Sequence, residues 1–258
     1  MDIKRALRVF LSLFVAVVLS ALAGCGKGAE ERSTSTAVNL ATPPLSQTSK
    51  ATPDDWKNAL EASFVMTDVK DGGEGVTEFS ACFKRVGKNC DAFAFGSRDA
   101  FRKLRFFTAG TSSAMDVFTY VPIYISLRDN ERPSLFLAPY FFSKGGWIFL
   151  NKIAIMLDGD VVLEQDFEGS AVKRNPEAAG VAEKVHFIAS EQQIASLRKI
   201  KPESTLLIRF TGQNGHISLD KERIEYFKSE IANALFIYDT INHALDGKVP
   251  TEVGTGPK

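Results

Sequence analysis

The sequence predicts a mainly β or α+β fold, in which an antiparallel sheet or β-sandwich carries a long C-terminal helix on one face. Three patterns support this expectation. Segments with strand character outnumber helical ones, and most neighbouring strands are separated by short hairpin-like connections. Near the C-terminus, apolar residues recur every three or four positions over about 24 residues, as in a helix with one buried stripe.

We expect residues 53–247 to form a single globular domain, because no repeat and no second shift in composition interrupts them. A chain of this length can bury a sizeable core. The predicted strands are residues 76–83, 91–95, 117–127, 135–142, 147–157, 161–167, 183–189, 206–212 and 215–217.

Prolines and a glycine turn indicate where several of these strands lie in the sheet or end. Pro122 removes a ladder donor from 117–127, which favours an edge or bulged strand, and Pro139 does the same in 135–142. Residues 147–157 are apolar on both faces and are predicted to form a central strand covered on both sides. The turn signal Asp158-Gly159 predicts an antiparallel hairpin with 161–167. The polar residues 168–181 are expected to form a surface loop.

Helix starts are marked by capping residues. Thr52 and Pro53 suit the N-cap and first position of a short helix. Ser190, with Gln193 three residues later, forms a capping box for a second helix. Asp220 is expected to cap the long C-terminal helix and its apolar stripe. That stripe comprises Ile224, Phe227, Ile231, Leu235, Tyr238, Ile241 and Leu245.

The first 24 residues have the layout of a secretory signal. Basic residues come first, an apolar stretch of 9–19 follows, and small residues come last. The apolar stretch is shorter than the roughly 20 residues that span a bilayer comfortably. An ordinary signal peptide and a retained membrane anchor are the alternatives to a cleaved lipoprotein signal.

The run Leu22-Ala23-Gly24-Cys25 resembles the lipobox of bacterial lipoproteins. The resemblance covers residues 1–25 only. It implies that 1–24 are a signal peptide and that the Cys25 thiol is joined to diacylglycerol, with further fatty acylation such as palmitate. Several acyl chains would then anchor the protein where one would not. Gly26, in place of an aspartate, favours the outer membrane facing the periplasm if the source is Gram-negative.

The segment 25–52 is expected to be the lipidated N-terminus followed by a flexible tether. It lacks aromatic residues and is rich in Ser, Thr, Gly, Ala and Pro, so it cannot bury enough apolar surface to fold alone. Residues 248–258 are expected to be a disordered tail, because Gly247 and Pro250 end the last helix.

The lipoprotein resemblance assigns Cys25 to lipid and leaves Cys82 and Cys90. In an exported protein, a lone pair this close in sequence predicts a disulfide that closes a hairpin. Redox chemistry is the alternative reading, but the pair has no Cys-x-x-Cys spacing.

Charge gives no support for nucleic-acid binding. Removal of residues 1–24 takes away three of 31 basic and one of 31 acidic residues, which leaves a formal charge of −2. The lipoprotein resemblance instead implies the membrane as partner, through the diacylglycerol on Cys25, and we expect an envelope protein or polymer as a second partner.

The sequence shows no catalytic motif, and we expect no cofactor and no metal. His186, His216 and His243 are scattered, and none has a second ligand at metal spacing. The chain lacks the Gly-x-Ser-x-Gly elbow, the phosphate loop and the dinucleotide-binding glycines. Whether the protein is an enzyme stays open at this stage, with a preference for a non-enzyme.

A basic-aromatic cluster is the first candidate binding surface. It could contact anionic headgroups or an anionic envelope polymer. The alternative, which we favour from sequence alone, is a short amphipathic helix whose phenylalanines enter the core. The cluster places Arg98, Arg102, Lys103 and Arg105 among Phe101, Phe106 and Phe107.

An aromatic strand face is the second candidate surface. Phe118, Tyr120 and Tyr124, with Tyr140, would form an exposed strip suited to a partner if no helix covers them. Burial under the C-terminal helix is the alternative, and the one we favour from sequence.

We therefore expect a lipid-anchored cell-envelope protein whose body is a non-enzymatic binding or assembly module. An anchored periplasmic hydrolase is one alternative, and it requires Ser, His and a carboxylate within hydrogen-bond reach of one another. A carrier for an apolar ligand is another, and it requires an internal cavity.

Overall fold

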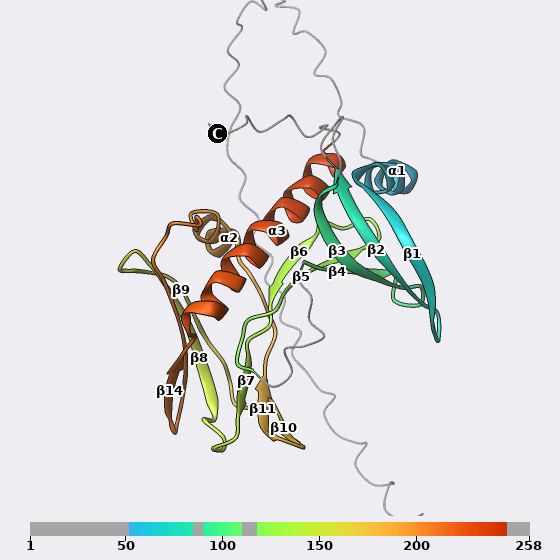
Figure 1. The fold of residues 1–258 in the computed structure, drawn as a ribbon. Coiled ribbons are helices and arrows are strands. Elements are labelled where there is room, and N and C mark those ends of the chain that lie inside the picture. The colour runs from blue at the N-terminus through green and yellow to red at the C-terminus, as the bar shows by residue number, and fades with distance from the viewer. Residues whose placement is uncertain (1–51, 85–89, 110–117, 247–258) are drawn as a thin grey trace, which may run out of the picture. The chain divides into compact units, whose positions relative to one another are not determined.

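The computed structural model describes residues 52–84, 90–109 and 118–246, all of which belong to one compact unit (Figure 1). The predicted signal peptide, Cys25, the tether before Thr52 and the C-terminal tail lie outside the described residues. Within the described ranges, no helix combines the length and the apolar character that crossing a bilayer would need.

A seven-stranded antiparallel sheet dominates the described residues, and its first six strands follow the order of the chain (Figure 1). A strand from much later in the sequence completes the far edge. In spatial order the strands are β1 (Phe64–Gly73), β2 (Val76–Lys84), β3 (Cys90–Asp99), β4 (Leu104–Thr108), β5 (Ile123–Arg128), β6 (Ser134–Leu137) and β12 (Phe187–Ile188).

Two smaller sheets complete the β structure of the described part. The first has the order β14-β13-β8-β9, and the second has the order β10-β11-β7. Their strands are β7 (Tyr140–Ser143), β8 (Leu150–Leu157), β9 (Asp160–Asp166), β10 (Lys173–Glu177), β11 (Gly180–Lys184), β13 (Leu206–Gly212) and β14 (Gly215–Ser218).

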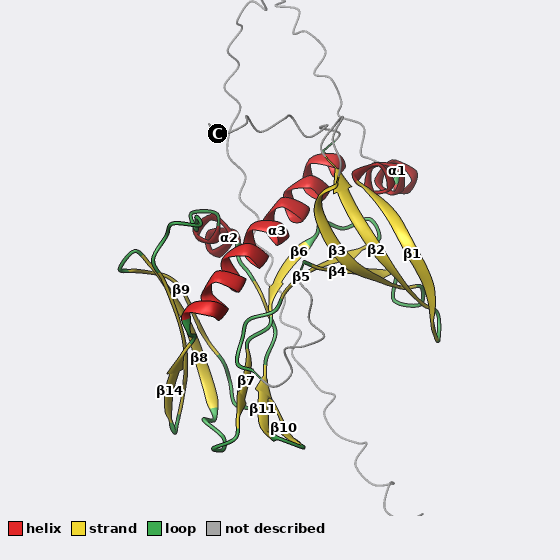
Figure 2. Cartoon of the chain, in the orientation of Figure 1, coloured by secondary structure: helices red, strands yellow, loops and turns green. Residues whose placement is uncertain are grey.

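The helices of the described part are α1 (Pro53–Ser63), α2 (Glu191–Leu197) and α3 (Lys221–Leu245). Helix α3 lies across one face of the main sheet (Figure 2), where it contacts β3, β5 and β6, and it also contacts α1 and β13. Its predicted apolar stripe is buried from Ile224 to Ile241. The predicted fold class is thus confirmed, with the C-terminal helix packed on the sheet.

The alternation of side chains in β5 shows how the sheet acquires two different faces. Ile123, Ile125 and Leu127 are almost fully buried, while Tyr124 and Ser126 between them are only half-buried. Successive residues of a strand point to opposite faces. The aliphatic face is therefore the inner face, which meets α3, and the other is the outer face.

The local start and turn signals behave as predicted. Thr52 and Ser190 each cap a helix in a capping box, and the Asp220 carboxylate accepts the N–H of Arg223. Strands β8 and β9 pair antiparallel around Asp158 and Gly159. Both turn residues have positive φ, as the two-residue turn of the strongest hairpin signal requires.

Prolines shorten two predicted strands more than we expected. The strand predicted over 117–127 begins only at Ile123, directly after Pro122. The strand predicted over 135–142 is split at Pro139 into β6 and β7, which belong to different sheets. In both places proline, which lacks a backbone N–H, interrupts the hydrogen-bonded ladder.

The strand predicted over 147–157 is central but shorter than expected. It begins at Leu150, because Phe149 has a φ of 55°, outside the strand region. Its Ile153 and Ile155 are buried, whereas Ala154 and Met156 on the other face are half-buried. The expectation of full coverage on both faces is therefore wrong.

Other errors concern strands that lack apolar alternation. The loop expected over 168–181 contains β10, which forms a hairpin with β11 and holds Pro176 at a sheet edge. The strand predicted over 183–189 is divided between β11 and β12. Strands β1 and β4 were missed: β1 is exposed except at Phe64, and β4 is short and contains the charged Arg105.

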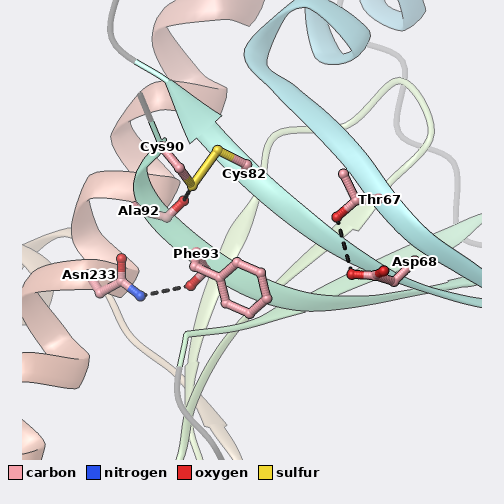
Figure 3. Close-up of a disulfide and its surroundings, with 7 residues drawn as sticks. All are labelled: Thr67, Asp68, Cys82, Cys90, Ala92, Phe93 and Asn233. Atoms are coloured by element: carbon pink, nitrogen blue, oxygen red, sulfur yellow. Dashed lines mark hydrogen bonds between the residues drawn. A yellow bond between two sulfur atoms is a disulfide. The ribbon is translucent and has the colours of Figure 1, made fainter. Parts of the chain in front are cut away.

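Cys82 and Cys90 form the predicted disulfide between β2 and β3 (Figure 3). Their Cα atoms are 5.4 Å apart, within the usual range for a disulfide. The neighbouring Phe93 carbonyl accepts a hydrogen bond of 2.9 Å from Asn233 of α3. The hairpin is thus tied both across its strands and to the helix.

Candidate functional site

An open cleft of about 370 Å³ lies where the inner face of the main sheet meets the helices. Its walls come from α1, the end of α3, the β3–β4 turn and the β5–β6 turn. Six of the described residues that line it are cationic and three are acidic, so the lining carries an excess of three positive charges. The charged residues are Lys57, Arg98, Arg102, Lys103, Arg105 and Arg128, with Asp54, Asp129 and Glu131.

Two arginines of this cleft are direct cross-strand neighbours. Arg98 of β3 pairs in register with Arg105 of β4. Cβ atoms of directly opposed residues lie roughly 5 Å apart, and like charges in this arrangement are destabilising. Arg105 is compensated by an ion pair with Asp129, and its side chain is only 12% exposed. Arg98 has no acidic partner among the residues that the structure describes.

The remaining cations of the cleft are weakly paired. The Arg102 Nε and Asp99 Oδ2 atoms are 3.5 Å apart, as are Arg128 Nε and Glu131 Oε1. Exposed ion pairs of this kind contribute little, about 0–1 kcal/mol. Lys103 is exposed and has no acidic partner in the described ranges. The positive charge of the cleft is therefore only partly cancelled by the protein itself.

Backbone hydrogen bonds hold the turns that carry these cations. The Asp129 N–H donates to the Lys103 carbonyl at 3.0 Å, which joins the two turns of the cleft. The Arg102 N–H donates to Asp99 Oδ1 at 2.9 Å within the β3–β4 turn. The Phe101 ring covers Gly75, where a Cβ would lie 2.6 Å from it. The cluster is therefore held in place before any ligand binds.

The helical wall of the cleft adds an apolar and aromatic patch beside the charged residues Asp54 and Lys57. Trp56 is half-buried and Leu60 is buried, and both belong to α1. Arg132 lies over the Trp56 ring at 5.9 Å and forms an ion pair with Asp246 after α3. A ligand in the cleft would meet guanidinium groups on the sheet side and an indole on the helix side.

This arrangement suits a multivalent anion. Arginine presents a planar fork of donors that matches the paired oxygens of phosphate and carboxylate groups. The four cations predicted from sequence all line this one cleft, at the β3–β4 hairpin and not on a helix. The amphipathic-helix interpretation is therefore wrong, although Phe107 does enter the core as expected.

The three aromatic residues predicted as one strip are separated in the structure. Phe118 is 42% exposed and lies 4.7 Å from the Arg223 guanidinium of α3. Tyr120 is buried beside Tyr140. Tyr124 lies on the outer face, away from α3, so burial under the C-terminal helix is wrong for this residue.

His186 is held by Tyr124, whose hydroxyl oxygen lies 3.0 Å from its Nδ1 atom. Burial, followed by repulsion from Lys184 and Lys173, lowers the pKa of His186. The described hydrogen bonds do not place this histidine with the serine and carboxylate that the hydrolase alternative requires. The described residues also contain no group of three metal-ligating side chains.

Sequence reasoning missed two buried carboxylates. Glu183 is fully buried and accepts the backbone N–H groups of Ile148, Phe149 and Leu150, together with Arg174 Nε. It stabilises the positive φ that starts β8. Glu230 of α3 is 6% exposed, and burial raises its pKa to about 8, opposed by a backbone hydrogen bond from Ile123. The position of Glu230 beside the apolar stripe was the available signal.

Comparisons with protein-family models, with curated proteins and with solved structures find no match to this chain.

Proposed function

We propose that this chain is a lipid-anchored cell-envelope protein whose body binds an anionic envelope ligand in the basic cleft. The observation that carries this proposal is the directly opposed pair Arg98 and Arg105, of which only Arg105 has an acidic partner, Asp129, in the part of the chain that the structure describes. A protein that only needed to fold would gain stability by separating these charges. A bound anion would supply the missing compensation.

The predicted anchor and the cleft lie close together along the chain. The lipobox resemblance puts the acyl chains on Cys25, and Thr52 then caps α1, which forms one wall of the cleft. A flexible tether of this length reaches about 30 Å. The cleft thus lies on the part of the body nearest the tether in sequence, within reach of anionic groups near the membrane surface.

The proposed location follows from the lipobox resemblance at residues 22–25. We place the protein on a membrane through its diacylglycerol-cysteine, and on the outer membrane facing the periplasm if the source is Gram-negative. Its partner would be a phosphate- or carboxylate-bearing envelope polymer, or a protein with an acidic surface. Charge complementarity with the cleft supports this class of ligand.

Calorimetry tests this proposal by measuring the binding of inorganic tripolyphosphate to the mature chain. The titration is done at low and at physiological salt. We expect Arg98→Gln and Lys103→Gln each to weaken binding several-fold, and added salt to weaken binding by the wild type. Lys199→Gln is the matched control, because Lys199 is an exposed lysine just after α2 and outside the cleft. Equal affinity in all four proteins would contradict the proposal.

The anchor is tested separately with Cys25→Ser. We expect the variant to lose metabolic labelling by palmitate and to remain unprocessed at residue 25. Normal labelling of this variant would overturn the anchor while leaving the result on the cleft unaffected.

A further inference from the structure

A row of side chains in register crosses the outer face of the main sheet. Phe95, Thr108, Tyr124, Phe136 and Ile188 are direct neighbours on β3, β4, β5, β6 and β12. Neighbouring strands are about 4.8 Å apart, so the row extends over about 19 Å. We call these five residues the outer row.

The outer row is largely aromatic, and its two ends are exposed. Phe95 is 47% exposed and Ile188 is 58% exposed, while Thr108, Tyr124 and Phe136 between them are half-buried. The Tyr124 and Phe136 rings stack at 4.8 Å with an angle of 8° between their planes. Phe106, on the same face, meets Tyr124 edge-on at 6.2 Å. Exposed apolar surface that is continuous across several strands is typical of an interaction site.

Contacts on both sides hold the rings of this face in position. The hydrogen bond between the Tyr124 hydroxyl and His186 keeps the tyrosine ring parallel to Phe136. Phe93 and Phe95 are perpendicular to each other at 5.1 Å. The face therefore presents ordered rings, so a ligand would not have to order them on binding.

Hydroxyl groups lie between the rings. Thr108 separates Phe95 from Tyr124 in the row, and Ser97 and Ser126 flank Phe106 in the next register position. A hollow of about 540 Å³ continues this face towards β1 and β2. Ser80, Asp68 and Glu78 line it and offer further hydroxyl and carboxylate groups, and Lys70, directly opposite Glu78, adds an ammonium group.

The chemistry of this face selects among possible ligands. None of the five residues of the outer row is charged, so the row offers no compensation for the phosphates of a nucleic acid. A purely apolar ligand would bury the hydroxyls of Thr108, Ser97 and Ser126 without partners, which costs free energy. A ligand that fits has apolar C–H surfaces for the rings and hydroxyl groups for the polar side chains.

We propose that the outer row binds a neutral saccharide chain, which would belong to the cell envelope if the proposed location holds. The exposed Phe95 ring offers apolar surface for the C–H groups of a sugar ring. The Tyr124 and Phe136 rings face each other, so they turn their partially positive edges toward the oxygen atoms of the ligand. The intervening hydroxyls and the Asp68 and Glu78 carboxylates then exchange hydrogen bonds with the sugar hydroxyls. The row is long enough to meet several sugar rings in succession. This site lies on the opposite face of the sheet from the basic cleft and does not depend on it.

Binding is tested with the mature chain and two neutral probes, chitohexaose and cellohexaose, by calorimetry and by NMR of the aromatic side chains. We expect one or both probes to bind and to perturb the signals of Phe95, Tyr124 and Phe136. Phe95→Ala and Phe136→Ala should each weaken binding about ten-fold, because each removes one ring that contacts the ligand. Phe101→Ala is the matched control, because Phe101 is 85% exposed and lies outside the row.

Tyr124→Phe separates ring positioning from folding. It keeps the ring but removes the hydrogen bond to His186, so we expect weaker saccharide binding with an unchanged melting temperature. The proposal is overturned if neither probe binds, or if Phe95→Ala and Phe136→Ala bind as the control does. It is also overturned if sedimentation shows a dimer that Phe95→Ala dissociates, because the row would then bind a second copy of the chain.

Discussion

The exposed residues on the two faces of the main sheet come from different kinds of structural element. The outer row arises from regular strand pairing, in which each neighbour in register contributes one side chain. The basic cleft arises where strands end, from turns and helix termini that contribute charge. The outer face thus follows the rules of a stable sheet, whereas the cleft places Arg98 opposite Arg105 against those rules.

The difference shows which part of the molecule is optimised for stability. The strand rules explain why Phe95, Tyr124 and Phe136 are in register, but they do not explain two opposed arginines. Sites that break a local rule are expected where function requires it. The following predictions test this contrast, in order of decreasing expected effect.

The buried phenylalanines on the inner face should stabilise the whole sheet, and with it both candidate binding sites. Phe107 is fully buried and contacts Phe64, Phe79 and Phe83. Phe107→Ala should lower the free energy of unfolding by about 3–5 kcal/mol, because it removes a buried ring and leaves a cavity. Urea denaturation measures this change. Phe101→Ala, at the exposed turn, should change it by less than about 0.5 kcal/mol, and a similar loss in both variants would contradict the assignment of the core.

Glu230 should make the helix–sheet contact dependent on pH. Its pKa is about 8 in the folded protein against a usual value of 4.5, because its carboxyl group is buried. Between these values the folded state holds a proton that the unfolded state has lost, so stability falls as pH rises. The slope should reach up to about 1.4 kcal/mol per pH unit and level off above the folded pKa.

Chemical denaturation between pH 5.5 and pH 7.5 measures this slope. Glu230→Gln keeps the size of the side chain and removes its titration, so the variant should lose this part of the pH dependence. Glu225→Gln, on an exposed position of the same helix, should keep it. If the wild type and Glu230→Gln showed the same pH dependence, Glu230 would be ionised in the folded state and the prediction would be wrong.

The disulfide should matter for the outer face more than for the cleft. Cys82 and Cys90 close a short loop, and opening it should lower the free energy of unfolding by about 2–3 kcal/mol. The double variant Cys82→Ser, Cys90→Ser tests this by urea denaturation, with the reduced wild type as a second measurement. We expect Phe93 and Phe95 to become more mobile by NMR, while tripolyphosphate binding stays unchanged. Loss of anion binding would contradict the independence of the two faces.

Much of the fold could be predicted because its signals are local. The caps at Thr52, Ser190 and Asp220 and the turn at Asp158 depend on neighbours within a few residues. The apolar stripe of α3 is equally local. Strand β1 could not be predicted, because it is stabilised by pairing with β2 and not by an alternating apolar pattern of its own.

The candidate sites depend on register, which a single sequence does not reveal. The cations from Arg98 to Arg105 were recognised as a cluster, but Asp129 and Trp56 come from other elements and could not be assigned to it. The aromatic strip was predicted along one strand, whereas the structure forms it across strands. Tyr124 belongs to both the predicted strip and the outer row. Its neighbours in register are Thr108 and Phe136, not Phe118 and Tyr120.

Arg98→Gln has the smallest expected effect on stability of these substitutions, and it tells the most about the cleft. Arg98→Gln removes one of two opposed like charges, so it should raise the free energy of unfolding by about 0.5 kcal/mol at low salt. The same substitution should weaken anion binding, since Arg98 is exposed and lacks an acidic partner in the described ranges. A gain in stability with a loss of binding is the expected signature of a residue retained for function.

Salt distinguishes this explanation from a packing effect. Added salt screens repulsion, so it should reduce the difference in stability between Arg98→Gln and the wild type. Arg128→Gln is the control, because Arg128 is paired with Glu131 and faces no arginine across its strand. That variant should be neutral or slightly less stable. If Arg98→Gln were instead destabilising at every salt concentration, Arg98 would be a structural residue and the basic cleft would lose its main support as a binding site.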